Sequence, residues 1–153
     1  MVNRRAQIAM SADEAERYLA GQPTLVVATI GPSGHPHVVA MWFALLEGKV
    51  AFWTFAKSQK IANLRRDPRI TGLVESGESY GELRGVELVG VGRIVPDEDQ
   101  VRAIGAAVWR KMRPDADPTA LDAHVIAQAG KRVGVILEAE RMVSWDHTKL
   151  ERA

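Results

Sequence analysis

The chain has 153 residues, of which 46% are hydrophobic and 25% are charged, as in a globular domain rather than a disordered or fibrous protein. Its formal net charge of +1 gives no overall attraction to nucleic acid or to an anionic membrane. Cysteine is absent, which excludes disulfides, thiolate nucleophiles and cysteine-based zinc sites, and no segment approaches the roughly 18 apolar residues of a membrane span. We therefore expect a single domain over residues 1–153 that is soluble and cytoplasmic, with no nucleic-acid or membrane partner.

Periodicity, capping residues and turn residues predict the elements. Ser11 and Glu14 form an S-x-x-E capping box before the first helix, and Gly31-Pro32-Ser33-Gly34 is a typical hairpin turn. In chain order we expect a helix over residues 12–20, strands over 24–30, 37–46 and 50–55, a helix over 58–66, strands over 70–75 and 86–95, helices over 97–112 and 119–129, and a strand over 133–145.

The predicted strands indicate an all-antiparallel arrangement. The first three follow one another through tight turns, the second turn being Glu47-Gly48-Lys49, and so predict a meander. About six antiparallel strands favour a barrel, because closure removes the exposed edges that an open sheet would leave.

Basic and polar residues gather around the short helix 58–66, directly after a strand. They are Lys57, Ser58, Lys60, Asn63, Arg65, Arg66 and Arg69. A helix N-terminus offers unpaired backbone N–H groups, and nearby lysine and arginine add charge-assisted bonds to phosphate. Ser58 and Lys60 are the best placed for an anion, and a solvated basic helix face is the alternative.

Aromatic residues lie on two neighbouring strands, in Met41-Trp42-Phe43 and Phe52-Trp53-Thr54-Phe55. Side chains alternate between the two faces of a strand, so some of these point inward and others outward. Core packing accounts for most of them. The alternative is that they form apolar walls for a flat ring cofactor.

The remaining motifs carry no chemistry of their own. His35 and His37 could share one face of a strand, but no further metal ligands are recognisable, and His124 and His147 are isolated. Gly90-Val91-Gly92 resembles part of a dinucleotide-binding fingerprint, but it lies within a strand and lacks the third glycine and the following helix. No G-x-S-x-G, P-loop or H-E-x-x-H motif occurs. We therefore predict no catalytic residue and no metal ligand.

The run from Leu25 to Ser76 resembles the pyridoxamine-phosphate-oxidase-like superfamily of split β-barrels. It contains A-T-x-x-x-x-G-x-P, a W-F strand, a W-T strand, S-x-K and N-L-R-R-D-P-R in that order. The last motif is similar to flavin/deazaflavin oxidoreductase group B, whose members include users of the deazaflavin coenzyme F-420. The segment from Arg84 to Gly92 also resembles the next strand of that family.

This resemblance implies a mainly β fold with flanking helices, a split β-barrel of the FMN-binding type, and a homodimer with a cofactor at each end of its interface. The cofactor ring would lie against the strand 39–42, and the phosphate-bearing tail would lie near the start of helix 58–66. Arg65 or Arg66 would meet a polyglutamate tail, and Trp145 would reach the partner's site. The predicted cofactor-binding residues are Val39, Ala40, Met41, Trp42, Trp53, Thr54, Ser58, Lys60, Asn63 and Arg65.

The function implied is an oxidoreductase that transfers a hydride from reduced coenzyme F-420 to an unsaturated small-molecule acceptor. One alternative is an FMN-dependent reductase or oxidase, and another is a non-catalytic protein that binds flavin, deazaflavin or haem. Oxidation of pyridoxamine phosphate itself is not expected, because the segment Asp146–Ala153 is short and lacks the arginine-rich substrate-binding character of those oxidases.

Overall fold

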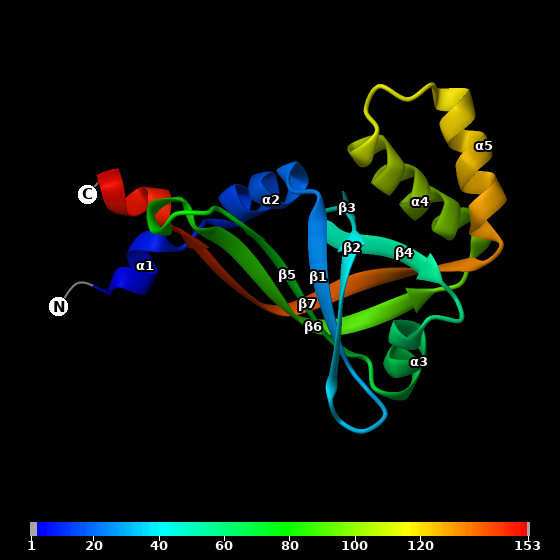
Figure 1. Cartoon of the computed structure of the whole chain (residues 1–153), viewed down its shortest axis with the longest axis horizontal. Helices are drawn as coiled ribbons and strands as arrows, with labels where there is room; N and C mark the ends of the chain where they lie inside the picture. The colour runs from blue at the N-terminus through cyan, green and yellow to red at the C-terminus, as the bar shows by residue number, and fades with distance from the viewer. Residues whose placement is uncertain (1–2, 153) are drawn as a thin grey trace.

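A computed structural model describes residues 3–152 and shows a curled antiparallel sheet with helices at its ends (Figure 1). The strands are β1 (Thr24–Ile30), β2 (Pro36–Trp42), β3 (Ala44–Leu46), β4 (Lys49–Phe55), β5 (Arg69–Ser76), β6 (Arg84–Val95) and β7 (Arg132–Asp146). The α-helices are α1 (Arg4–Ile8), α2 (Ala12–Gly21), α3 (Gln59–Arg66), α4 (Glu98–Met112) and α5 (Pro118–Ala129), and two 3₁₀ helices are η1 (Tyr80–Glu82) and η2 (His147–Arg152). Among the described helices, none is long and apolar enough to cross a bilayer.

The strands pair in the order β2-β1-β5-β6-β7-β4-β3. The four predicted helices are confirmed within one residue at each end, and Ser11 makes the predicted capping box with Glu14. The single strand predicted over residues 37–46 is wrong: it is two strands, β2 and β3, which pair with β1 and β4 respectively. The predicted meander is therefore wrong too, and the sheet has seven strands rather than six. The break between β2 and β3 cannot be predicted from the sequence pattern, because inner and outer side chains continue to alternate through Phe43.

Phe43 marks the place where the two edges of the sheet meet. β2 and β3 are the outermost strands of the order, and Phe43 alone separates them in the chain. One residue spans at most about 3.6 Å, so the sheet must curl until its edges adjoin at this point. No strand pairing joins β2 to β3 or β4, and this barrel is therefore split, as predicted. We call Trp42–Ala44 the barrel seam.

Two hydrophobic cores lie on opposite sides of β4. Phe52 packs inside the barrel together with Leu19 of α2 and Ile61 of α3. Trp53, the next residue, points to the outer face and packs against Ile104 of α4. The hairpin of α4 and α5 therefore covers the outer side of β4 and β7, beside the seam (Figure 1).

The glycines of the Gly90-Val91-Gly92 segment serve close packing. The pairing of β6 with β7 shifts register between Val89 and Gly90. A Cβ atom at Gly90 would lie 2.0 Å from the backbone oxygen of Glu138, so no larger residue fits this bulge. At Gly92 a Cβ would lie 3.0 Å from the side chain of Leu64 in α3. Both glycines thus allow neighbouring elements to approach closely.

Lys111, in the last turn of α4, fastens the α4–α5 hairpin to the seam. Its Nζ donates a hydrogen bond of 3.1 Å to the carbonyl oxygen of Leu19 and lies 3.5 Å from the ring centroid of Phe43. Burial lowers the pKa of Lys111 from 10.5 to about 8. The native state therefore releases this proton at a lower pH than the unfolded chain does.

This shift predicts a pH-dependent stability. Below pH 8 both states hold the proton, whereas between pH 8 and 10.5 only the unfolded state does, so unfolding becomes less favourable as the pH rises. Over this range the free energy of unfolding of the wild type should gain roughly 1 to 3 kcal/mol relative to Lys111→Met. Urea titrations of both proteins at several pH values measure this difference. A difference that stays constant with pH would contradict the assignment.

Candidate functional site

The N-terminus of α3 carries a capping residue without a capping bond. Ser58 occupies the N-cap position with extended backbone geometry, but its side chain caps no backbone N–H group. Its Oγ atom is buried and has no hydrogen-bond partner among the described residues. A buried hydroxyl and the unpaired N–H groups of a first helical turn are together suited to binding an anion.

Lys60 lies two residues further on and is buried. Its side chain is 8% exposed, and its Nζ donates a hydrogen bond of 2.9 Å to Oγ1 of Thr54, itself buried in β4. Burial, followed by the nearby positive charge of Arg132, lowers the pKa of Lys60. The alternative of a solvated basic helix face is therefore wrong for Lys60, although Lys57 is exposed.

Among the described side chains, those of residues 3–150, no carboxylate lies within ion-pair distance of Lys60 or Arg132. Burying a charge without a counter-ion costs several kcal/mol, by order of magnitude. An anion bound beside Lys60 would offset this cost. Thr54, Ser58 and Lys60, which the sequence predicted as a group, are thus brought together at one end of the barrel.

The other predicted residues of α3 take different positions. Asn63 is fully buried, where its Nδ2 donates a hydrogen bond of 3.0 Å to Oγ1 of Thr29 and its Oδ1 accepts one of 2.8 Å from Gln59. Asn63 therefore fixes α3 against β1. Arg65 is exposed in the last turn of α3, at the opposite end of the helix from Ser58.

A pocket of about 340 Å³ opens at the barrel seam beneath α4 and α5. Trp53 is 6% exposed and lies deep in this pocket, whereas Trp42 is 42% exposed. Trp109 of α4 meets the ring of Trp42 edge-on at 5.7 Å, and the ring of His124 at 4.4 Å. The lining residues are Ala40, Met41, Trp42, Trp53, Val108, Trp109, His124 and Arg132.

The pocket therefore contains three of the four residues predicted to lie against the cofactor ring, together with Trp53 from the predicted cofactor-binding set. The exception is Val39, which alternates to the inner face of β2 and packs against the barrel core. The volume is within the range of small-molecule sites, about 300 to 1,000 Å³. The pocket lies along the free edge of β2, where backbone groups have no partner strand.

Arg132 is the charged group of this pocket, and it was not among the residues predicted from the sequence. It begins β7 opposite Phe55, and its guanidinium carbon lies 4.7 Å from the ring centroid of Trp53 and 4.3 Å from that of Phe55. Its Nε atom is buried without a hydrogen-bond partner among the described residues, and burial lowers the pKa of Arg132. The available signal was an arginine directly before five residues without a polar side chain, Val133–Leu137.

The helical side of the pocket, namely Val108, Trp109 and His124, was not predicted from the sequence. The prediction that His124 is isolated is wrong, because its ring packs against Trp109. Trp109 and His124 come from α4 and α5. The apolar periodicity of these helices predicts which face packs on the barrel, but not which residues border the pocket. Nothing local in the sequence indicates that the edge of this hairpin reaches the seam.

The other histidines lie apart from the pocket and from one another. His35 is exposed in the β1–β2 turn, and His37 of β2 pairs with Thr29. His147 lies at the far end of the molecule, where its Nδ1 is 2.8 Å from the backbone oxygen of Tyr80. In the part of the chain that the structure describes, no three potential metal-ligating side chains converge.

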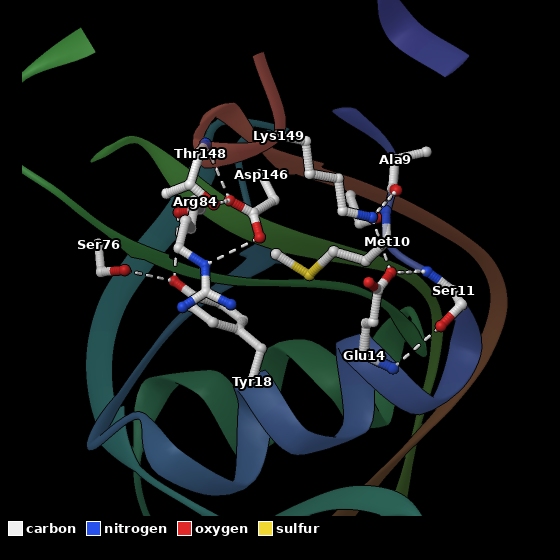
Figure 2. A network of polar contacts seen from close by, with 11 residues as sticks. Ala9, Met10, Ser11, Glu14, Tyr18, Ser76, Arg84, Asp146, Thr148 and Lys149 are labelled. Carbon is white, nitrogen blue, oxygen red and sulfur yellow. Dashed lines mark hydrogen bonds and ion pairs between the residues drawn. The ribbon is translucent and has the colours of Figure 1, made fainter. Parts of the chain in front are cut away.

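A second polar cluster lies near the chain termini, at the end of the molecule opposite α3 and α4, and its charges are paired (Figures 1 and 2). Nζ of Lys149 lies 2.8 Å from Oε2 of Glu14, and Nε of Arg84 lies 3.4 Å from Oδ2 of Asp146. The hydrogen bond from Lys149 is the main cause that lowers the pKa of Glu14 to about 2. This cluster ties α2 to the C-terminal segment. Its cations Lys149 and Arg84 each have a carboxylate partner, whereas Lys60 and Arg132 have none among the described side chains.

Trp145 belongs to that same distant end. It lies 13 positions after Arg132 on β7, which corresponds to about 40 Å along the strand. Its ring packs over Gly85, where an added Cβ would lie 2.1 Å from the indole. Within one chain Trp145 therefore does not reach the pocket, and its predicted role at a partner's site stays a prediction.

Comparisons with known proteins agree with this architecture. A family profile described as pyridoxamine 5'-phosphate oxidase matches residues 11–145. A conserved hypothetical protein of Mycobacterium tuberculosis is 41% identical, with a TM-score of 0.91 over 98% of this chain and 93% of that chain. An F-420 reductase is 26% identical, with a TM-score of 0.63 over 83% of this chain and 94% of that chain.

An FAD-binding protein from Mesorhizobium loti is 18% identical, with a TM-score of 0.61 over 89% of this chain and 93% of that chain. At this identity the likeness concerns the fold alone. A search among curated proteins finds no match to the chain.

Proposed function

The chain belongs to the pyridoxamine 5'-phosphate oxidase family, and from this premise we propose that it is an oxidoreductase using the deazaflavin coenzyme F-420. Proteins of this group bind flavin-type cofactors. The reaction proposed is the transfer of a hydride from the reduced cofactor, together with a proton from water, to an unsaturated small molecule. The acceptor gains two electrons and the cofactor is oxidised.

The observation that carries this proposal is the buried, uncompensated charge of Lys60 in the first turn of α3, two residues after the orphaned hydroxyl of Ser58. A cofactor phosphate would accept hydrogen bonds from both side chains and from the first N–H groups of α3. Thr54 already orients the ammonium group through its hydrogen bond of 2.9 Å. The residues present therefore fit a phosphate-bearing cofactor.

The ring would occupy the seam pocket, with Ala40 and Met41 on one side and Trp53 deep within it. When bound, the reduced ring supplies the hydride. The protein contributes apolar walls that exclude water, a fixed orientation and the anion clamp of Ser58 and Lys60. Asn63 holds α3, and hence this clamp, in place on β1.

Deazaflavin is favoured over FMN by the surface around α3. Lys57 and Arg65 are exposed there, and the described residues include no ion pair for either side chain. Such residues suit the acidic tail of coenzyme F-420, which FMN lacks. The 26% identity to an F-420 reductase over 83% of the chain agrees with this choice.

Titration of the purified protein with coenzyme F-420 and with FMN, followed in parallel by fluorescence, tests the proposal. We expect tighter binding of F-420, and this binding should weaken as salt is raised because the acidic tail meets exposed charges. FMN binding at least tenfold more tightly would favour the FMN-dependent alternative. Tight cofactor binding without reduction of any acceptor would favour a carrier.

We also propose that the active form is a homodimer. The outer hydrophobic core beneath α4 and α5 contains no described residue of β1, β2 or β5. The outer face of these strands and of β6 carries the cross-strand row Val38, Ala28, Thr71 and Val89. Val38 is 58% exposed. This apolar face continues through Ala40 to the seam pocket, so a second copy seated on it would adjoin the cofactor site.

Light scattering at micromolar concentration should therefore give twice the chain mass of 16.8 kDa. The variant Val38→Lys, which places a charge on the outer face, should shift the protein toward the monomer. Lys49, whose charge is already paired with Glu138 at another edge, offers the control substitution Lys49→Gln. A wild type that scatters as a 16.8 kDa monomer would refute the dimer.

A further inference from the structure

Half of the seam pocket is formed by residues that the cofactor proposal does not use. Val108, Trp109 and His124 come from the α4–α5 hairpin, and Arg132 comes from the start of β7. These residues face the same space as Trp42 and Trp53. We call this set, Trp42, Trp53, Val108, Trp109, His124 and Arg132, the hairpin side of the pocket.

Arg132 supplies this side with an oriented positive charge. Contacts with the rings of Trp53 and Phe55 hold its guanidinium group, and the side chain otherwise makes one long hydrogen bond of 3.5 Å to Gln128. Its Nε atom is buried and has no partner among the described residues. None of the residues that line the pocket is acidic. An anionic group of a ligand would supply the partner that Arg132 lacks among the described residues.

The aromatic residues define the shape of that ligand. Trp42 and Trp109 meet edge-on, and Trp109 and His124 do the same, so ring faces and edges border the space. Aromatic side chains of this kind bind flat, conjugated molecules. The planar fork of an arginine matches carboxylates and phosphates in a bidentate manner. Because Ser58 and Lys60 already offer a site for the cofactor phosphate, a carboxylate is the anion left for Arg132.

We propose that the hairpin side is the acceptor subsite and binds a planar aromatic carboxylate, with its ring among Trp42, Trp53 and Trp109 and its carboxylate on Arg132. Its assignment as the acceptor subsite rests on the proposed function. The existence of a binding site for an aromatic carboxylate does not depend on that function. The ring of the substrate would then stack toward the cofactor along β2. Trp109 and His124 determine which ring shapes enter.

Calorimetric titration with 2-naphthoate, a two-ring aromatic carboxylate, tests this inference directly. The neutral isostere 2-naphthylmethanol reports the aromatic contribution alone. Arg132→Gln should weaken naphthoate binding by roughly 10- to 150-fold, the loss of one charge-assisted contact, and leave the neutral ligand nearly unchanged. Arg102→Gln is the matched control, since Arg102 pairs with Glu98 on α4 outside the pocket, and it should change neither affinity.

Trp109→Ala should weaken both ligands, because it removes a wall rather than a charge. If Arg132→Gln does not fold, Arg132→Lys keeps the charge without the planar fork and should give an intermediate loss of naphthoate affinity. Equal naphthoate affinity in the wild type and in these Arg132 variants would overturn the inference. So would the absence of naphthoate binding at millimolar concentration.

A final titration separates this inference from the proposed function. Naphthoate added to protein saturated with coenzyme F-420 should still bind. Strict competition would mean that the cofactor ring fills the hairpin side, which overturns the acceptor subsite and leaves the proposed function intact. If no flavin-type cofactor binds at all, the proposed function fails, and the direct titration still decides whether the carboxylate site exists.

Discussion

Replacing Lys60 by Ala should weaken the binding of coenzyme F-420 by roughly 10- to 150-fold, which is the value of one charge-assisted contact of about 1.5 to 3 kcal/mol. The physical reason is the position of the ammonium group, which is buried, held by Thr54 and without a carboxylate partner among the side chains of residues 3–150. Fluorescence titration of the wild type and the variant measures the loss.

Lys49→Ala is the matched control for this experiment. It removes the same charge from an exposed side chain at the other end of β4, where Lys49 pairs with Glu138, so its effect should stay within about threefold. Thermal melts of the cofactor-free Lys60→Ala protein should differ little from the wild type, since losing the bond to Thr54 is offset by losing an uncompensated buried charge. Equal affinities of wild type and Lys60→Ala would remove Lys60 from the site.

Replacing Phe43 by Ala should destabilise the protein by about 3 to 5 kcal/mol, the usual cost of truncating a fully buried aromatic side chain. Phe43 is 0% exposed and lies at the seam, where it fills the junction of the two sheet edges. The ammonium group of Lys111 lies 3.5 Å from the centroid of its ring. Chemical denaturation gives the change in the free energy of unfolding.

Phe55→Ala is the corresponding control, because the same truncation occurs on the same sheet at a side chain that is 51% exposed. Its cost should remain near or below about 1 kcal/mol. The Phe43 variant should also lose cofactor affinity, since Trp42 and Trp53 border the pocket beside the seam. Similar stability losses for the two variants would show that the seam does not depend on Phe43.

Capping residues, turn residues and periodicity predicted the individual helices and strands well. They did not predict which strands pair with one another. The capping box of Ser11 and the turn at Gly48 are encoded by neighbouring residues, and both are confirmed. The change of partner at Phe43 leaves no local trace, because the alternation of inner and outer side chains continues through it. Strand pairing depends on contacts that are distant in the sequence.

The candidate site shows the same division. Ser58 and Lys60 were placed correctly at the start of a helix, but the burial of Lys60 was missed. Lys60 precedes Asn63 and Leu64 by three and four positions, so the three side chains share one face of α3. All three are buried. Arg132 and Trp109 could not be found in this way, since they reach the pocket only after β7 and α4 have packed against β4.

The position of β7 in the sheet has a consequence for how the chain folds during synthesis. β7 is the last strand to be made, yet it lies between β6 and β4 and joins the two halves of the barrel. Until it emerges from the ribosome, one edge of β4 has no partner, and exposed edges of this kind pair readily with other chains. Pairing of distant segments is also slow, on the order of milliseconds to seconds. Nascent chains of this protein should therefore be prone to pair with other chains along β4 until β7 has been released.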